Sequence, residues 1–341
     1  MVKLSPLCHV QNAHEGEIWC CAFTRDGRHV VTGANDEVVH AWTSRGDPGD
    51  VKDDIKDDDD AQPLTRTTSS STRAHALGCV SMDCDPNAPS RCAVTALDGA
   101  TRCVDVDADA RGGTPTPAPT IVSSAPPGQA WGVAFDPTPA HTHGGHSRLA
   151  IAGGSTSTIA VVDIDERGRG ARRATMAFPE PSAERFARSV AYSPDGSRIA
   201  CGAMDGTVGV FDAHTGTFLH ALRGHARPVR DVAFARDGKT VYTACDDGYC
   251  HVYDAHNRSL IDALGGHTSW VLSVCPSPTR ADVVVTTSSD CSVKLWDVSA
   301  RACAQTMSDH VDAVWCARFS PDGARLVACS SDASFSVFTC V

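Results

Sequence analysis

Short apolar runs separated by polar turns cover most of the chain, and this pattern predicts strands rather than helices. Four of the turns carry an Asp-Gly pair between two apolar runs, in FTRDGRHV, YSPDGSRI, FARDGKTV and FSPDGARL. An Asp-Gly pair in this setting is a strong signal for a β-hairpin. No segment repeats its apolar residues with the period of a helix. We therefore expect an all-β protein.

A unit of about 42 residues repeats along the chain. In each unit a strand, a turn and a second strand lead to an Asp, and a large apolar residue follows six positions later. Five units also begin with a His that lies 22 or 23 residues before the Asp: His14–Asp36, His75–Asp98, His225–Asp247, His267–Asp290 and His310–Asp332. Two further units lack the His and end near Val162-Asp163 and at Phe211. The chain therefore holds seven units.

These marks resemble those of WD-repeat proteins, in which repeats of about 40 to 45 residues carry Gly-His and Trp-Asp pairs. Each such repeat forms one four-stranded blade of a β-propeller. The resemblance implies that residues 1–341 form a single seven-bladed propeller. The approximate blades are 12–72, 73–124, 125–180, 181–222, 223–264, 265–307 and 308–341 together with 4–11.

The two ends of the chain predict how the ring closes. After His310 only three strands fit before Val341, whereas residues 4–11 (LSPLCHVQ) precede the first unit and have no partner there. We expect this N-terminal segment to complete the last blade. Such closure leaves no open sheet edge, which would otherwise invite aggregation.

In WD-repeat proteins the His, a Thr or Ser four residues before the Asp, the Asp and the Trp form a hydrogen-bonded tetrad that ties three strands together. This chain carries two full sets: His14, Thr32, Asp36 and Trp42; and His267, Thr286, Asp290 and Trp296. A near-complete third set has Tyr in place of Trp: His225, Thr243, Asp247 and Tyr253. A buried Asp is tolerated only when it is paired. We therefore interpret these His and Asp residues as structural rather than catalytic.

Composition and charge narrow the possible functions. The formal net charge of the 341-residue chain is -11, which disfavours direct nucleic-acid binding because that binding relies on Lys and Arg replacing counterions. No apolar run is long enough for a membrane span, and no secretory signal is recognisable. We expect an intracellular protein whose 16 cysteines are reduced and mostly buried.

The repeat pattern is interrupted mainly in the first half of the chain. Residues 46–63 (GDPGDVKDDIKDDDDAQP) are predicted to be a disordered acidic insertion, although they could instead contact a basic partner or a cation. The segment HTHGGH carries His141, His143 and His146. These three could bind a metal in principle, but no fourth ligand is evident, so we favour a flexible loop. No catalytic motif is present, and we expect no catalytic residue, metal or cofactor.

The candidate site comes from comparing equivalent positions around the ring. The first strand of each WD blade lines the central channel, and the residues three and five positions past each His lie at its top face. Four of the 6 tryptophans fall at these positions. The predicted partner-binding residues are Glu17, Trp19, Trp131, Phe186, Arg188, Arg230, Asp246, Trp270, Leu272 and Trp315. Such a ring has the composition of an interaction hot spot, although large side chains could also simply fill the blade ends.

We expect this surface to bind a short peptide. The peptide would carry an aromatic or apolar anchor and a basic residue that faces Glu17 or Asp246. Two alternatives remain open. Arg188, Arg230 and the tryptophans could stack RNA bases or enclose a methylated lysine of a histone tail, or the chain could be a scaffold of another WD-repeat complex.

The second half of the chain carries a more specific resemblance. The segments YSPDGSRIACGAMDGTVGVFD, TACDDGYCHVYD, GGHTSWVLSV and SSDCSVKLWDV resemble the WD-repeat subunit that the superkiller complex and the polymerase-associated factor complex share. This implies a non-enzymatic adaptor of the cytoplasm and nucleus. Its implied partners are a tetratricopeptide scaffold and an RNA helicase that feeds messenger RNA to the exosome, or transcription elongation subunits. The acidic loop and the longer insertions of blades two and three depart from this family.

Overall fold

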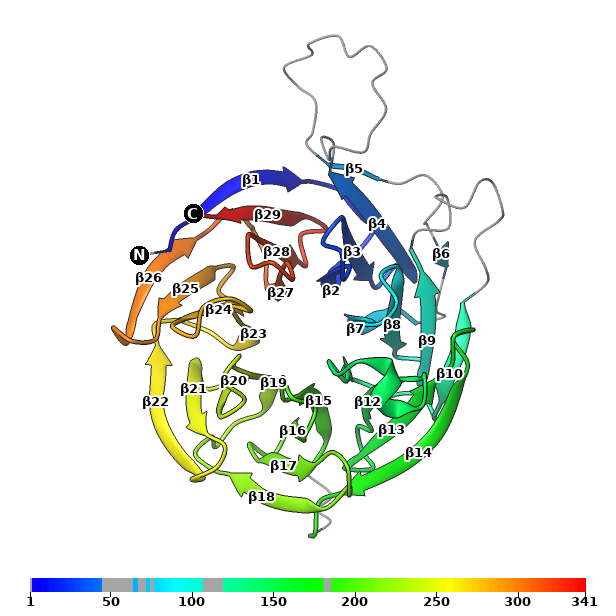
Figure 1. The fold of residues 1–341 in the computed structure, drawn as a ribbon. Helices are drawn as coiled ribbons and strands as arrows, with labels where there is room; N and C mark the ends of the chain where they lie inside the picture. Colours follow the sequence, from blue (N-terminus) through cyan, green and yellow to red (C-terminus); the bar gives the residue numbers. More distant parts are fainter. Residues whose placement is uncertain (1, 45–63, 67–71, 74–76, 107–118, 181–184) are drawn as a thin grey trace.

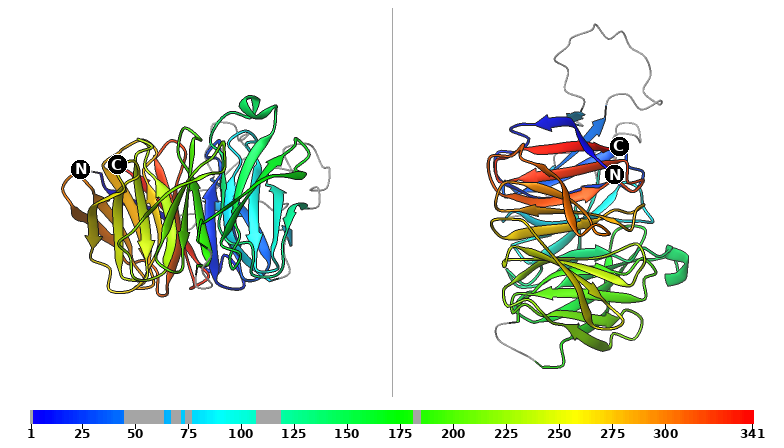
Figure 2. Two further views of the ribbon diagram at one scale, coloured as in Figure 1. Left: turned by 90° about the horizontal axis from the view of Figure 1, so that it is seen from below. Right: turned by 90° about the vertical axis from the view of Figure 1, so that its left-hand side faces the viewer.

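The computed structural model describes residues 2–341 except 45–63, 67–71, 74–76, 107–118 and 181–184. Seven sheets stand around a central channel and together form a disc (Figures 1 and 2). The predicted seven-bladed β-propeller is therefore confirmed. Apart from one short 3₁₀ helix, η2 (Ala140–His143), the regular elements of the described residues are all strands. The predicted acidic insertion at 46–63 lies outside the described residues.

Each blade orders its strands from the channel outward. The innermost strands are β2 (Ile18–Phe23), β7 (Cys79–Cys84), β11 (Val133–Phe135), β15 (Ala187–Tyr192), β19 (Val229–Phe234), β23 (Val271–Pro276) and β27 (Val314–Phe319). The second strands are β3 (His29–Ala34), β8 (Arg91–Ala96), β12 (Ser147–Ala152), β16 (Arg198–Ala203), β20 (Thr240–Cys245), β24 (Val283–Ser288) and β28 (Arg325–Ser330).

The third and outer strands complete the sheets. The third strands are β4 (Val38–Ser44), β9 (Ala100–Asp105), β13 (Thr158–Ile164), β17 (Val208–Asp212), β21 (Tyr249–Asp254), β25 (Val293–Asp297) and β29 (Phe335–Cys340). The outer strands are β10 (Thr120–Ser124), β14 (Gly170–Ala177), β18 (Phe218–Leu222), β22 (Ser259–Gly265), β26 (Ala302–Met307) and β1 (Leu4–Val10). In the first blade two short strands, β5 (Leu64–Arg66) and β6 (Thr72–Arg73), both pair with β4.

The N-terminal strand closes the ring, as predicted. Strand β1 pairs antiparallel with β29, from Leu4 opposite Cys340 to Val10 opposite Phe335, so that the two chain ends lie together (Figure 1). The Gln305 side chain of the sixth blade also binds the backbone of Leu4 through both its oxygen and its nitrogen, at 2.9 and 2.7 Å. The closure therefore joins the last blade to its neighbour as well.

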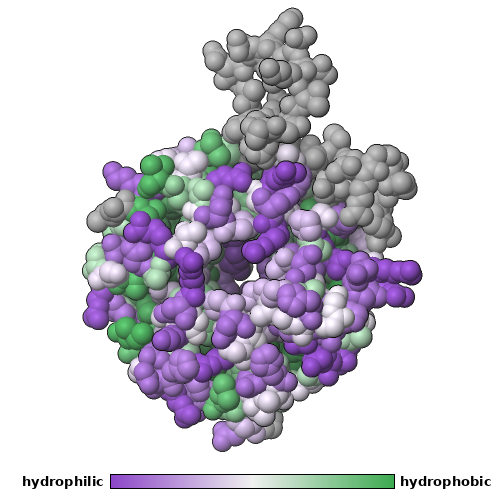
Figure 3. Space-filling view, in the orientation of Figure 1, coloured by the Kyte–Doolittle hydropathy of each residue, from purple (hydrophilic) through white to green (hydrophobic). Residues whose placement is uncertain are grey.

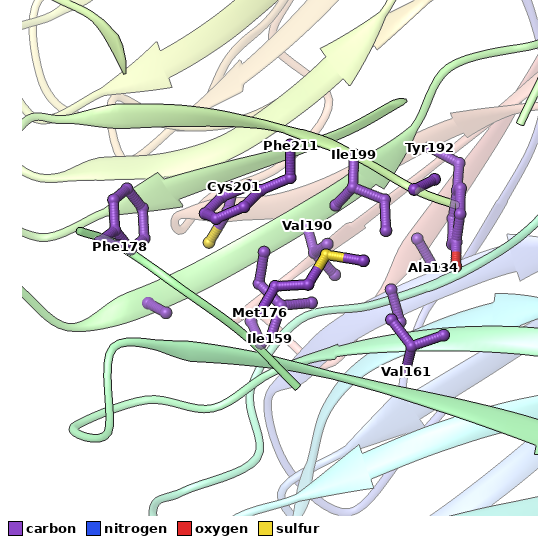
Figure 4. Packing of buried hydrophobic residues seen from close by; sticks show 14 residues of the cluster. Ala134, Ile159, Val161, Met176, Phe178, Val190, Tyr192, Ile199, Cys201 and Phe211 are labelled. Carbon is purple, nitrogen blue, oxygen red and sulfur yellow. The ribbon is translucent and has the colours of Figure 1, made fainter. Parts of the chain in front are cut away.

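The hydrophobic core lies between neighbouring blades. Between the third and fourth blades, Met176 and Phe178 pack against Tyr192, Ile199 and Phe211 (Figure 4), and the rings of Phe178 and Phe211 meet edge to face at 5.3 Å. The second strands are buried on both faces, which explains their nearly continuous Val, Ala, Cys and Ile sequences. The outer strands are largely exposed and carry more polar residues. The inner strands are therefore held rigidly around the channel.

All 16 cysteines of the chain are free thiols, and most are buried. Burial raises the pKa of several of them, including Cys201 to about 12, which leaves these thiols protonated and unreactive at neutral pH. None of the helices among the described residues has the length and apolar character needed to cross a membrane.

Candidate functional site

The sixth blade contains a complete hydrogen-bonded tetrad. Nδ1 of His267 lies 2.9 Å from the Asp290 carboxylate, and burial lowers the pKa of this imidazole although Asp290 acts in the opposite direction. Because the carboxylate only accepts, the neutral ring donates from Nδ1 and accepts at Nε2 from the Thr286 hydroxyl, 2.7 Å away. The Thr286 oxygen in turn accepts from Nε1 of Trp296 at 2.8 Å. Each polar side-chain atom of this tetrad thus has a hydrogen-bond partner.

The first blade repeats this arrangement with His14, Thr32, Asp36 and Trp42, at 2.8 to 2.9 Å. The fifth blade differs at its last member. His225 binds Asp247 at 2.6 Å and Thr243 at 2.7 Å, but the Tyr253 hydroxyl pairs with Nδ1 of His251 at 3.0 Å. The prediction that Tyr253 completes the set as Trp does is therefore wrong, because its polar atom sits at the far end of the ring.

The last blade has an incomplete set that the sequence analysis did not assign. His310 binds Asp332 at 3.1 Å and the Ser334 hydroxyl at 3.0 Å, both through Nδ1. Its Nε2 atom is buried without a hydrogen-bond partner. The reason is local, since Ala328 stands four residues before Asp332, where the complete sets carry Thr.

Six of the seven inner strands contain a β-bulge at the same place. In each, one residue is skipped in the pairing with the second strand, so that two residues oppose one. The skipped residues are Trp19, Val80, Arg188, Arg230, Leu272 and Trp315. A bulge breaks the strict alternation of a strand and re-aims a side chain. It therefore turns both the skipped residue and the one after it toward the channel.

These side chains enclose a cavity of about 350 Å³ at one end of the channel. Seven of the ten predicted partner-binding residues line it: Glu17, Trp19, Trp131, Arg188, Arg230, Leu272 and Trp315. We call the surface formed by these seven residues the channel mouth. Figure 3 shows one face of the disc, where mostly hydrophilic residues surround the central hollow.

The other three predicted residues lie beside the cavity and contact residues that line it. Phe186 packs edge to face against Trp131, with ring centroids 5.3 Å apart. Asp246 binds Arg230, and Trp270 is 48% exposed with its ring 5.2 Å from the Arg230 guanidinium. These three residues therefore flank or support the channel mouth and do not line the cavity themselves.

The third and fourth blades meet at a corner formed by Trp131 and Arg188. The Arg188 guanidinium lies 4.7 Å from the centre of the Trp131 ring, a cation–π distance. Gly132 allows this approach, because its N–H donates to the Arg188 carbonyl at 2.9 Å and a Cβ there would lie 2.8 Å from that oxygen. Nε1 of Trp131 donates to the Gly128 carbonyl at 2.7 Å, which fixes the indole.

A second arginine, Arg230, is held by a carboxylate. Its Nε and one terminal nitrogen donate to the two oxygens of Asp246, at 2.6 and 2.7 Å. Such a two-bond pair is geometrically specific and strong. Arg230 therefore neutralises the Asp246 carboxylate, which leaves Glu17 as the more available of the two carboxylates predicted to face a basic residue of a partner.

The first and last blades share a small polar network at the channel mouth. Nε1 of Trp19 donates to Oε2 of Glu17 at 2.9 Å, and Nε1 of Trp315 donates to the Ser331 hydroxyl at 2.6 Å. That hydroxyl lies 3.4 Å from the same Glu17 oxygen. Among the described residues no cation pairs with Glu17, so its second oxygen can still accept a hydrogen bond.

Deeper in the channel lies an ion pair that sequence reasoning missed. Asp231 accepts from the Ser273 hydroxyl at 2.8 Å and faces Arg318 of the last blade at 3.4 Å. Burial raises the pKa of Asp231, and Arg318 counters part of that rise. Burial also raises the pKa of the nearby Asp83 to about 6. Asp231 and Arg318 lie six and eight residues past their His, so counting further along the inner strands would have found them.

In the described part of the chain, two clusters place His and Asp atoms close enough to hold a metal: His14, Asp36 and His40, and His225, Asp247 and His251. Both ring nitrogens of His14 and of His225 are already bound to Asp and Thr, so the arrangement is satisfied without an ion. In the predicted histidine loop, His143 contacts Asp136 at 3.0 Å while His141 and His146 are exposed. These three therefore do not converge on one point.

Comparisons with known proteins agree with this geometry. The family model "WD domain, G-beta repeat" matches residues 5–43, 181–212, 216–254, 258–297 and 301–339. The chain is 34% identical to "WD repeat-containing protein VIP3" of Arabidopsis thaliana over 67% of this chain and 63% of that protein, so it spans less than two thirds of that relative. It is 28% identical to "WD repeat-containing protein SL1-17" of Schistosoma mansoni, over 98% and 99% of the two chains.

Proposed function

Because the chain belongs to the WD-repeat family, we propose that it is a non-catalytic scaffold that binds a short segment of a partner protein at the channel mouth. The observation that carries this proposal is the cavity of about 350 Å³ with three indoles in its wall. Trp and Arg are the residue types that dominate binding energy at protein interfaces. A preformed concave site of this kind also limits the entropy lost on binding.

The chemistry of the cavity favours binding over catalysis. Within the described residues, its wall includes no histidine, and Asp231 already accepts a hydrogen bond from the Ser273 hydroxyl. Ser189 lines the cavity without a basic neighbour within hydrogen-bond distance. A nucleophile needs an adjacent base, so this wall is better suited to holding a ligand than to transforming it.

The polar groups that remain available define the partner segment in part. The indole rings and Leu272 offer an apolar surface for an aromatic or aliphatic anchor. Glu17, which has no cationic partner among the described residues, can face a basic side chain. Of the two carboxylates predicted to face that basic residue, Glu17 is favoured over Asp246, which Arg230 neutralises.

We further propose that the partners are subunits of the superkiller complex, of the polymerase-associated factor complex, or of both. The support is the resemblance of residues 186–341 to the WD-repeat subunit that these assemblies share. The partners would then be a tetratricopeptide scaffold and an RNA helicase, or elongation subunits. The protein would then act in the cytoplasm and the nucleus.

Affinity purification of the tagged chain from its own cells, followed by quantitative mass spectrometry, tests this assignment. Recovery of a tetratricopeptide protein with an RNA helicase supports the superkiller assembly, and recovery of elongation subunits supports the nuclear one. The same experiment with Trp19→Ala should lose those proteins if the channel mouth holds them. Recovery of neither set would contradict the assignment.

A further inference from the structure

The two arginines of the channel mouth occupy equivalent bulge positions in neighbouring blades, but their surroundings differ. Arg230 makes a two-bond ion pair with Asp246. The side chain of Arg188, unlike its backbone carbonyl, makes no hydrogen bond or ion pair with any described residue. Its guanidinium rests on the Trp131 ring at 4.7 Å and lines the cavity. Its five N–H donors are therefore available to a ligand.

This arrangement leaves a cation without a counter-charge in a partly desolvated place. Burial, with a contribution from the positive charge of Arg230, lowers the pKa of Arg188 to about 10. An arginine is normally protonated far above that pH. A buried charge without a partner costs free energy, and the cost is relieved when an opposite charge arrives.

The number of arginines without a carboxylate partner indicates how many anionic groups of a ligand the cavity can pair. Arg318 faces Asp231 at 3.4 Å, and Arg230 is neutralised by Asp246. Only Arg188 remains without a carboxylate among the arginines that line the described cavity wall. A single carboxylate matches one unpaired guanidinium. A phosphate backbone would require several cations, and the chain as a whole carries a net charge of -11.

We propose that the channel mouth recognises an Asp or Glu side chain of the partner segment, which binds the Arg188 guanidinium through two parallel hydrogen bonds while Trp131 holds that guanidinium in place. This inference rests on the proposed function, because it specifies the chemistry of the same binding surface. The carboxylate belongs to a side chain because the segment crosses the channel mouth and also places an apolar anchor on the indoles. Glu17 and Arg188 together then select a segment with one basic and one acidic residue.

A peptide selection tests the proposal. Random decapeptides displayed within a loop, so that they carry no free carboxyl terminus, are selected against the wild-type protein and against Arg188→Met, Arg188→Lys and Arg188→Glu. Arg236→Met is the matched control, because Arg236 is exposed at the far end of β19 and donates to the Thr279 carbonyl. Thermal unfolding of each variant establishes that it folds.

We expect one position of the selected peptides to be enriched in Asp or Glu. By fluorescence anisotropy, the best peptide should bind Arg188→Met about 10- to 100-fold more weakly, Arg188→Lys by an intermediate amount, and Arg236→Met unchanged. Arg188→Glu should select Lys or Arg at the same position. This reversal of charge is a result that a purely structural role of Arg188 would not produce.

Several outcomes would overturn the inference. If the selected peptides bind Trp131→Ala more weakly but bind Arg188→Met normally, the proposed function stands and the claim that Arg188 recognises a carboxylate fails. If peptides are enriched only from a parallel library with free carboxyl termini, the carboxylate that binds Arg188 belongs to the end of the partner chain and not to an Asp or Glu side chain. Binding of a single-stranded RNA 20-mer that depends on Arg188 would replace the peptide by a nucleic acid. If no peptide is enriched on the wild-type protein, the proposed function itself fails.

Discussion

The tetrads and the channel mouth both combine tryptophan with a carboxylate, yet they use their polar groups differently. In the sixth blade His267, Thr286, Asp290 and Trp296 satisfy one another. At the channel mouth the Arg188 guanidinium makes no hydrogen bond or ion pair with a described residue, and no described cation pairs with Glu17. Groups that hold the blades together are therefore distinguished by having their hydrogen bonds satisfied within the protein, whereas groups that can bind a partner keep donors or acceptors available.

Removing a tetrad carboxylate should give the largest effect on stability. In Asp290→Ala, His267 loses its acceptor, as do the Ser292 hydroxyl and the Thr268 N–H. Leaving the buried His267 ring and Ser292 hydroxyl unpaired should lower the free energy of unfolding by about 3 kcal/mol. Urea unfolding measures this loss, with the exposed Asp309→Ala of the same region as the control. A loss below about 1 kcal/mol would contradict the structural role of the tetrad.

Truncating an indole of the channel mouth should instead weaken binding. We expect Trp131→Ala to reduce the affinity for a selected peptide or recovered subunit by about 2 kcal/mol, because the ring both forms the cavity wall and positions Arg188. Leu260→Ala is the control, since Leu260 is exposed on an outer strand away from the cavity wall. Equal binding by the two variants would show that partners bind elsewhere.

A tetrad carboxylate, Asp290, and the carboxylate of Asp83 on the inner strand of the second blade should respond oppositely to pH. Burial acts to raise the pKa of Asp290, but the hydrogen bonds of its carboxylate with Ser292, Thr268 and His267 outweigh burial and lower that pKa to about 2. The stabilisation from the ionised Asp290 is therefore present above pH 4 and is lost as the pH falls toward 2. Burial raises the pKa of Asp83 to about 6, so stability is lost as the pH rises through 6. The free energy of unfolding of Asp83→Asn should therefore rise relative to that of wild type from pH 4 to 7. Asp290→Asn should be less stable than wild type at neutral pH, and this difference should disappear near pH 2.

Urea unfolding at a series of pH values compares each Asn variant with wild type. Using the difference between the two proteins cancels the titration of the other carboxylates. Parallel pH profiles for Asp83→Asn and Asp290→Asn would contradict the assigned surroundings of the two groups.

Completing the unfinished set of the last blade should give a small gain. A hydroxyl at position 328 can donate to the unpaired Nε2 of His310, as Thr286 does to His267. We expect Ala328→Ser to raise the free energy of unfolding by about 1 kcal/mol, and Ala328→Val, which adds volume without a donor, to lower it. A loss of stability in the serine variant as well would contradict the claim that Nε2 of His310 lacks a hydrogen-bond donor.

Much of the fold could be predicted from the sequence because local features determine it. The spacing from His267 to Asp290 reflects the two strands that must fit between hydrogen-bonded partners, and the unpaired segment 4–11 could only complete the last blade. The Asp-Gly turns fixed the hairpins in the same way. These features depend on residues close together in the sequence, or on a terminal segment that needs a neighbouring strand to pair with.

The detailed chemistry of the channel mouth could not be predicted in the same way. The pairing of Arg230 with Asp246 depends on side-chain conformations, which leave Arg188 unpaired at the equivalent position of the next blade. The pair formed by Asp231 and Arg318 joins strands 87 residues apart across the channel. Repeat spacing identified the positions that face the channel, but the three-dimensional pairing decides which charges remain available.

Site-specific photo-cross-linking in cells tests the central claim most directly. A photoreactive residue replaces Leu97, which lines the cavity, or Arg236, at the far end of β19. We expect the partner subunit to cross-link from position 97 and not from position 236. Cross-linking from position 236 alone, with none from position 97, would contradict the claim that the channel mouth holds the partner.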